Sequence, residues 1–215
     1  MKINTFILMA ACVTGLIACS ANPAAPDYDK LTADVARASF RSEGIATIDR
    51  LQQDEANHAC SAADVAGQPL DPQTVKALEA GSLKTVKAPS NGVYIGDWKE
   101  GEKIAQNGRG LTWTDSAADA NGGNCYNCHQ ITKQEVSFGT LGPSLYNYGK
   151  LRGVTDPGST DSRPIVEYTW GKIWTPRGSN ACSNMPRFGH NGILSEKQIK
   201  DVMALLLDPK SAVNE

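Results

Sequence analysis

The pattern of apolar and polar residues predicts a chain made mainly of helices. The clearest signal lies near the C-terminus, where four apolar residues recur at helical spacing: Ile199, Val202, Met203 and Leu206. Ser195 followed by Gln198 forms a capping box at the start of this run, and Asp208-Pro209 ends it. The sequence therefore predicts an amphipathic helix between Ser195 and Asp208.

A second helix is predicted to begin at Asp97 and to end near residues 107–108. Asp97, with Glu100 three residues later, resembles a capping box. Ile104 and Ala105 continue an apolar face, and Gly101 leaves room on it for close packing. We therefore expect this helix to pack tightly against another element.

Earlier residues give three weaker helical patterns, at 32–40, 45–62 and 72–81, with Gly44 between the first two and Gly81 ending the third. Residues 93–95 favour a short extended piece, and residues 110–124 form a loop rich in glycine, aspartate and asparagine. No alternation typical of half-buried strands and no internal repeat is present. The expected fold is therefore mostly α, with long loops and an N-terminal helical extension.

Residues 125–129 carry the most specific chemical motif of the chain, Cys125-Tyr126-Asn127-Cys128-His129. Two thiols three positions apart can each add across a vinyl group of haem, and the adjacent imidazole then lies against the iron. C-x-x-C-H is the attachment signature of a c-type haem. We therefore expect one covalently attached haem c, bound through Cys125 and Cys128, with His129 as an axial ligand of the iron.

The same two cysteines could instead bind zinc or exchange disulfides. Zinc would need a second pair of ligands at similar spacing, and only His58, His129 and His190 could supply imidazoles. A thioredoxin-type motif needs a surrounding βαβ pattern, whereas the neighbouring residues are rich in glycine and asparagine. The motif therefore favours haem over both alternatives.

The N-terminus has the features of an export signal. Lys2 supplies a positive charge ahead of a mostly apolar stretch, residues 5–17, that is too short to span a bilayer as a helix. Leu16-Ile17-Ala18-Cys19 resembles a bacterial lipoprotein signal, which predicts removal of residues 1–18 and lipidation of Cys19. Ordinary signal peptidase cleavage nearby is the alternative. Either outcome predicts a periplasmic protein, and a lipidated end could tether it to a membrane.

The charge of the chain excludes one class of partner. The sequence has 21 basic and 23 acidic residues, and removing residues 1–18 takes away Lys2 only, so the mature chain is weakly acidic. It has no basic stripe, so nucleic acid is not expected as a partner. A minimal haem domain needs only about half of the mature chain. We therefore predict a flexible leader at 19–30, an N-terminal helical extension at 31–92 and a haem domain at 93–210.

Two cysteines remain once those of the export signal and the haem motif are set aside, Cys60 and Cys182. In an oxidising compartment they most simply pair, which predicts a disulfide joining the extension to the haem domain. In chain-entropy terms, closing so long a loop contributes about 4 kcal/mol to stability. Two free thiols, or a copper or redox site, are the alternatives.

The second axial position of the iron has several candidate ligands. Met185 lies in an irregular segment and precedes Pro186, an arrangement that can present its sulfur at a set distance, so we expect Met185 to be the sixth ligand. Met203 lies on the apolar face of a predicted helix, which suits core packing. His190 and, more weakly, His58 are the competing ligands. With both axial sites filled by the protein, the haem transfers electrons and does not bind the molecule being oxidised.

Residues 141–145, of sequence LGPSL, resemble the G-P-x-L segment of class I cytochromes c. In that family the proline carbonyl accepts a hydrogen bond from the imidazole that ligates the iron. The resemblance implies that Pro143 orients His129 and tunes its basicity. The order of C-x-x-C-H, G-P-x-L and a loop methionine is more specific than each part alone, and it implies a class I cytochrome c-like haem domain.

Longer stretches resemble the SoxX family, the monohaem cytochrome subunits of SoxAX complexes in periplasmic sulfur oxidation. The matching stretches are residues 96–102, the C-Y-N-C-H motif, residues 139–145 and residues 184–194. Together they cover the haem domain. Residues 30–66 are similar to the N-terminal extension of the longer members, whereas a lipoprotein-like signal is not a feature of the family as a whole.

The resemblance implies an electron-accepting role beside another subunit. In the family, SoxA carries a haem ligated by a modified cysteine, and there thiosulfate is joined oxidatively to a cysteine of the carrier SoxYZ. The implied partners are therefore a SoxA-like subunit, a SoxYZ-like carrier and a small soluble cytochrome c that accepts the electrons. The chain would be the non-catalytic haem subunit of an L-cysteine S-thiosulfotransferase, with no catalytic residue of its own.

Two other functions fit the same residues. A stand-alone electron carrier would use the same haem motif and Met185, although the extra N-terminal third argues against a minimal shuttle. A peroxidase-like haem enzyme would keep an open iron position, and its ferric form would bind cyanide or azide at low concentration.

Overall fold

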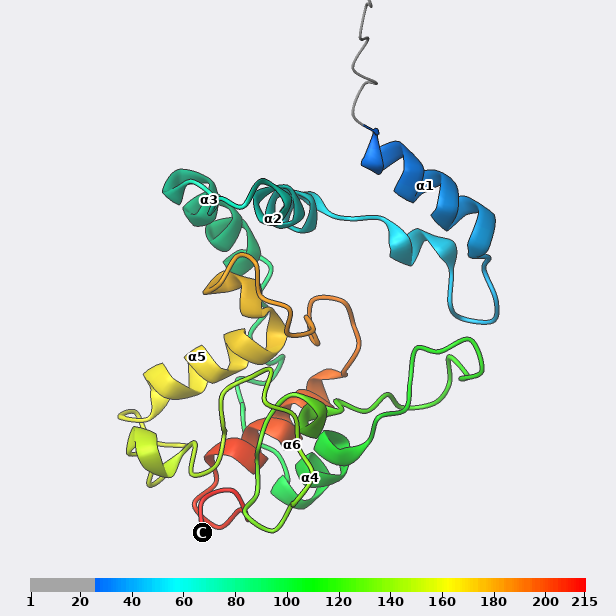
Figure 1. The fold of residues 1–215 in the computed structure, drawn as a ribbon. Coiled ribbons are helices and arrows are strands. Elements are labelled where there is room, and N and C mark those ends of the chain that lie inside the picture. Colours follow the sequence, from blue (N-terminus) through cyan, green and yellow to red (C-terminus); the bar gives the residue numbers. More distant parts are fainter. Residues whose placement is uncertain (1–25) are drawn as a thin grey trace, which may run out of the picture. The chain divides into compact units, whose positions relative to one another are not determined.

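The structure is a computed structural model that describes residues 26–215. The predicted export signal and Cys19 lie outside the described residues. The chain divides into two compact units after Ser39. The first contains helix α1, Tyr28–Ser39, which begins before the predicted start at residue 32, and the second contains residues 40–215 (Figure 1).

The second unit consists of helices and short 3-10 turns joined by long loops. Its α-helices are α2 (Glu55–Ala66), α3 (Pro72–Leu83), α4 (Trp98–Gln106), α5 (Arg163–Trp174) and α6 (Glu196–Leu207). Its 3-10 turns are η1 (Ile48–Leu51), η2 (Cys125–Asn127), η3 (Lys150–Arg152) and η4 (Pro176–Gly178). Residues 26–215 contain no β-strand beyond one isolated bridge, so 93–95 is not a strand. The mostly α fold with long loops is confirmed.

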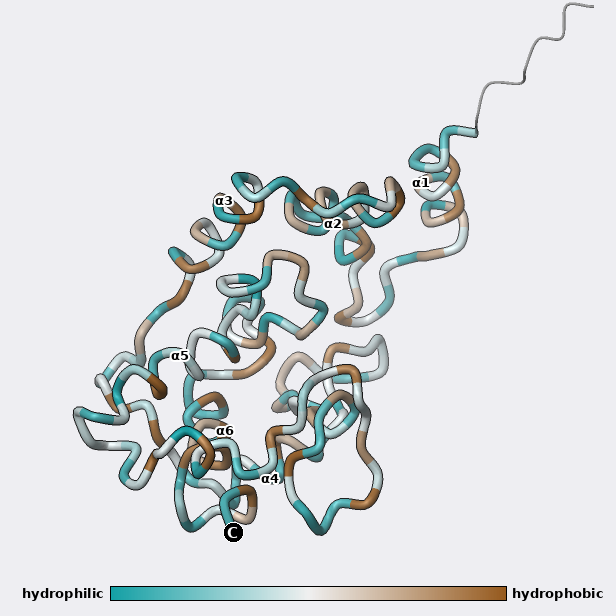
Figure 2. Tube along the Cα trace, turned by 60° about the vertical axis from the view of Figure 1, so that its left-hand side comes forward, coloured by the Kyte–Doolittle hydropathy of each residue, from teal (hydrophilic) through white to brown (hydrophobic). Residues whose placement is uncertain are grey.

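The core is built where α4 crosses α6. Helix α6 buries most of its side chains, and Met203, Leu205 and Leu207 are fully enclosed. Gly101 lies at the crossing, where a β-carbon would collide with the carbonyl of Asp201. Close approach of the two helices therefore requires glycine at this position. Figure 2 shows the hydrophobic and hydrophilic positions alternating along the helices.

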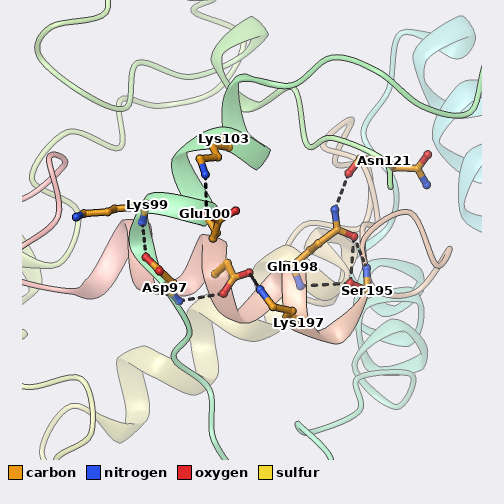
Figure 3. A network of polar contacts seen from close by, with 9 residues as sticks. Asp97, Lys99, Glu100, Lys103, Asn121, Ser195, Lys197 and Gln198 are labelled. Atoms are coloured by element: carbon orange, nitrogen blue, oxygen red, sulfur yellow. Dashed lines mark hydrogen bonds and ion pairs between the residues drawn. The ribbon is translucent and has the colours of Figure 1, made fainter. Parts of the chain in front are cut away.

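A polar network fixes the start of both helices (Figure 3). Ser195 and Gln198 form the predicted capping box at the start of α6. Asp97 caps α4 by accepting a hydrogen bond from the backbone of Lys99 at 2.8 Å. Glu100 pairs with Lys103 at 2.7 Å and accepts no hydrogen bond from the Asp97 amide. Asp97 is therefore a cap as predicted, but the predicted capping box at α4 is wrong.

The predicted helix over 45–62 is also wrong. The chain forms the 3-10 turn η1, breaks, and begins again as α2, which continues to Ala66. Asp54 causes the restart, because its extended backbone leaves its carboxylate free to accept a hydrogen bond from the Asn57 amide at 2.9 Å. Gly67, with φ of 64°, ends α2 in the left-handed conformation.

Helix α5 was not predicted as a helix from the sequence. Ser162, which precedes it, makes no side-chain cap hydrogen bond, so the usual start signal is missing. The buried residues Val166, Trp170 and Ile173 nevertheless follow helical spacing. This spacing is the signal that could have identified α5. Every helix within residues 26–215 is too short or too polar to cross a membrane.

Candidate haem and electron-transfer site

The C-x-x-C-H motif forms a single tight turn. Residues Cys125–Asn127 are a 3-10 helix, and the backbone amides of Cys128 and His129 both donate to the carbonyl of Cys125, at 3.1 and 2.9 Å. Cys125 and Cys128 are free cysteines, not joined to each other. Burial raises the pKa of Cys125 to about 12, so its thiol is protonated at neutral pH. Both sulfur atoms are therefore available for thioether bonds.

The imidazole of His129 is oriented by Pro143. Its Nδ1 lies 2.7 Å from the carbonyl oxygen of Pro143. Because a carbonyl only accepts hydrogen bonds, Nδ1 must carry the proton. The tautomer that results leaves the lone pair on Nε2, the atom that can ligate a metal.

The loop that contains Pro143 is bonded to the haem motif by its backbone. The amides of Gly139, Gly142 and Leu145 donate to three carbonyls of residues 126–130, at 2.8, 2.8 and 2.7 Å. A β-carbon on Gly142 would collide with the ring of His129, and one on Gly139 would collide with the carbonyl of Asn127. Glycine at both positions lets the loop approach the motif closely enough for the Pro143 contact.

Tyr126, inside the motif, ties it to helix α4. Its buried hydroxyl donates to Glu102 at 2.8 Å and shares a hydrogen bond with Thr132 at 3.0 Å. Burial raises the pKa of Tyr126, so the phenol stays protonated. The sequence interpretation treated this residue only as a spacer between the cysteines. Its role depends on a partner 24 residues away, Glu102, which no motif identifies.

The candidate sixth ligands occupy different environments. Met203 is fully buried in α6 among core residues, as its position in the apolar pattern predicts. Met185 lies on the loop before α6, partly buried, and packs against the core. His190 and His58 are exposed. Met185 combines a loop position with partial burial, and it stays the predicted ligand.

The structure brings Cys60 of α2 and Cys182 together in a disulfide. Other contacts join the same extension to α5 and its end. The indole Nε1 of Trp170 donates to the carbonyl of Lys87 at 2.8 Å, and the hydroxyls of Ser82 and Thr175 lie 2.8 Å apart. Residues 40–92 therefore belong to the same compact unit as the haem motif.

One buried donor in this region has no partner. The indole Nε1 of Trp174 is enclosed and makes no hydrogen bond. Its ring stacks on Trp170, with 6.0 Å between centroids, and a β-carbon on Gly189 would collide with it. A buried donor without an acceptor is costly. Bound haem carries two carboxylates, which are acceptors of the kind that Trp174 lacks.

These residues fit a c-type haem. Two free thiols and an imidazole with its Nε2 available are the groups that such a cofactor would use. Within residues 26–215, no three histidine, cysteine, aspartate or glutamate side chains gather as a metal site, which disfavours the zinc alternative for the C-x-x-C pair.

Comparison with known proteins gives two findings. The sequence model of the family described as "Cytochrome c" matches residues 99–209, from the first turn of α4 to just beyond α6. The chain is also 32% identical over 210 residues to a protein of Aquifex aeolicus (strain VF5) named "Uncharacterized lipoprotein", and the alignment covers 94% of each chain. The second similarity therefore includes the extension as well as the haem motif.

Proposed function

Because the chain belongs to the cytochrome c family, we propose that it is the electron-accepting haem subunit of a periplasmic SoxAX complex. Membership in the family implies covalently bound haem c and a role in electron transfer. The four stretches that resemble SoxX support the assignment to sulfur oxidation, since they include both the haem motif and the Met185 loop.

One observation supports assigning the sulfur chemistry to a partner and the electron uptake to this chain. Residues 26–215 contain a single disulfide, Cys60–Cys182, and two free cysteines, Cys125 and Cys128, both in the haem motif. Once haem is attached, this part of the chain has no thiol left to bind or transfer sulfur. The sulfur chemistry therefore belongs to a SoxA-like partner, and this chain takes up the electrons.

The residues around the motif have separate roles. Cys125 and Cys128 hold the haem covalently, and His129 ligates its iron through Nε2 while Pro143 fixes the ring by accepting from Nδ1. Met185 would supply a thioether ligand to the iron, which would favour the ferrous state. When bound, the haem iron supplies reversible one-electron transfer. If His129 and Met185 both ligate the iron, the protein would leave no position on it for a substrate.

The electron balance fixes what the complex must do. Forming one S–S bond between thiosulfate and the cysteine thiolate of a SoxYZ-like carrier releases two electrons. This chain accepts them one at a time and passes each to a small soluble cytochrome c. In this way it serves as the non-catalytic subunit of an L-cysteine S-thiosulfotransferase.

Co-expression tests the complex. The full chain, produced with the genes that neighbour it and a haem attachment system, should co-purify with a second haem protein in a 1:1 complex. Thiosulfate added with the carrier should then reduce this chain's haem. Recovery of a monomer that still exchanges electrons with soluble cytochromes would support a stand-alone shuttle. High-spin ferric iron that binds cyanide at low concentration would support a peroxidase-like enzyme.

The proposal includes a lipid anchor at Cys19. The Leu16-Ile17-Ala18-Cys19 sequence and the name of the Aquifex aeolicus relative both support it. A diacylglyceryl group on Cys19 would hold the haem domain near the periplasmic face of a membrane through residues 20–39. Mass analysis of the native N-terminus should show lipidated Cys19. An unmodified end produced by ordinary cleavage would remove the anchor from the proposal but leave electron transfer intact.

A further inference from the structure

Helix α2 presents one face to η4 and to the loop that follows it, which carries Met185. Three of its residues, spaced three apart along the helix and its cap, make the contacts: Asp54, Asn57 and Cys60. This spacing places them on one side of α2. Because α2 belongs to the N-terminal extension, these contacts attach the extension to the part of the haem domain that should supply the sixth ligand.

Asp54 pairs with two arginines at once. Its carboxylate accepts from Nη1 of Arg177 at 2.9 and 2.8 Å, and Nη2 of Arg187 lies 2.7 Å from the same group. Arg177 also donates to the side chain of Asn57. The two arginine side chains are 14% and 23% exposed and the Asp54 side chain is 38% exposed, so these ion pairs are partly buried and are only partly screened by solvent. Loss of the Asp54 charge would leave two guanidinium groups uncompensated.

The anchor points lie on both sides of Met185. The Cys60–Cys182 disulfide joins α2 to the loop three residues before the methionine, and Arg187 joins it two residues after. Between α2 and the loop is a cavity of about 390 Å³ lined by polar groups and by Met185 itself. Apolar packing does not fill this space. The disulfide and the ion pairs are therefore the contacts that fix this loop to α2, in addition to the burial of Phe188 in the core and the hydrogen bond from the His190 amide to the Trp174 carbonyl.

We propose that Asp54 and the Cys60–Cys182 disulfide are positioning elements that hold the Met185 sulfur at the haem iron. This inference rests on the proposed role of Met185 as sixth ligand. A thioether carries no charge that would draw it to a cation, so its placement must come from the supporting structure. If the loop were released from α2, the Met185 sulfur would dissociate from the iron more often. Outside ligands could then bind at the open position.

The test uses the full-length holoprotein and the variant Asp54→Asn. Asparagine caps a helix as well as aspartate does, so α2 keeps its start while the arginines lose their counter-charge. The matched control is Asp71→Asn, which changes the corresponding cap of α3, where the carboxylate contacts only Gln73 and Thr74. A second variant, Cys60→Ser with Cys182→Ser, removes the other anchor.

Two measurements report on the methionine bond, the weak near-infrared sulfur-to-iron band and the affinity of the ferric protein for cyanide. Apparent affinity scales with the fraction of molecules whose iron is open. We expect Asp54→Asn and the double serine variant each to weaken the band and to raise cyanide affinity by about tenfold or more. Asp71→Asn should match the wild type in both.

Met185→Ala separates the two possible failures. If the wild type lacks the band, or if Met185→Ala keeps it, the ligand assignment is wrong. If Met185→Ala loses the band while Asp54→Asn and the double serine variant keep wild-type spectra and cyanide affinity, the ligand assignment stands and the positioning role is refuted. Should Asp54→Asn not fold, the double serine variant alone decides between these results.

Discussion

The two sides of the proposed haem site are held in different ways. On the His129 side, the hydrogen bond that orients the ring joins residues only 14 apart, His129 and Pro143, and backbone hydrogen bonds hold the Pro143 loop to the motif. On the Met185 side, the contacts that attach the loop to α2 are between side chains far apart in sequence. Arg177 and Asp54 are separated by 123 residues, and Cys60 and Cys182 by 122.

This difference predicts different sensitivities. The His129 side should depend on a few residues whose replacement removes haem or crowds the ligand. The Met185 side should depend on the extension, and its failure should expose the iron without releasing the cofactor. Five predictions, from the largest effect to the smallest, test this contrast.

Replacing both Cys125 and Cys128 by serine should abolish covalent haem attachment, because no other free cysteine exists in residues 26–215. The measurement is whether colour stays with the polypeptide after denaturation and acid extraction. The double variant Cys60→Ser with Cys182→Ser is the control and should keep its haem. Haem retained after loss of both motif cysteines would overturn the attachment site and the function built on it.

Removing the Cys60–Cys182 disulfide should reduce the free energy of unfolding by about 5 kcal/mol, the chain-entropy value for cysteines separated by 122 residues. Denaturant unfolding of the oxidised wild type and of the double serine variant measures the difference. The hydrogen bond between His129 and Pro143 should survive in the variant, as seen by an unchanged His129 imidazole signal in NMR. Equal stability of the two proteins would mean that the disulfide contributes no anchoring.

Gly142→Ala should destabilise the protein by about 2 kcal/mol, since the added methyl group collides with the His129 ring. Gly171→Ala is the matched control. Gly171 lies within α5 with no atom near its missing side chain, so alanine there should be neutral or slightly stabilising. Thermal unfolding compares the three proteins. Similar behaviour of both variants would show that the close contact at Gly142 is not required.

As the pH falls, the contacts that hold the Met185 loop to α2 should be lost before those that orient His129. Burial acts to raise the pKa of Asp54, but the Asn57 amide and the guanidinium of Arg177 outweigh it, so the pKa lies below its usual value. The stability from Asp54 is therefore present above about pH 4 and is lost as pH falls through the lowered pKa.

The measurement is the unfolding free energy of wild type and Asp54→Asn across this range. The difference between them should shrink with acid. Burial, with the charge of Arg187, lowers the pKa of His190 nearby and Asp54 acts to raise it, so the same comparison is made with His190→Gln in both proteins. A difference that is constant down to pH 2 would contradict the ion pairs with Arg177 and Arg187.

Trp174→Phe should have the smallest effect. It removes an indole N–H that has no partner within the protein, so the stability of the haem-free chain should change little. If that N–H donates to a haem carboxylate, its removal leaves the negative charge of the carboxylate less compensated. That charge stabilises ferric iron relative to ferrous iron. The reduction potential should then fall by a few tens of millivolts, since about 59 mV corresponds to a tenfold change for one electron. An unchanged potential would assign the unpaired indole to packing alone.

The parts of the fold that could be predicted share a physical basis. The helix from Ser195 and the start of α4 at Asp97 follow from local caps and apolar spacing, which act within a few residues. The break before α2 was missed because Asp54, in the polar residues that follow Leu51, was not recognised as a new cap. Helix α5 was missed because it has no cap signal and is stabilised mainly by buried Trp170 and its neighbours.

The sequence alone determined the haem chemistry, because attachment and proximal ligation need only Cys125, Cys128 and His129 within five residues of chain. It also indicated the export of the protein and the mainly helical fold. Only the tertiary structure decided that Asp54 lies between Arg177 and Arg187, and that the N-terminal extension brackets the Met185 loop. Contacts across more than a hundred residues depend on how helices pack, and packing leaves no local pattern from which such partners can be identified.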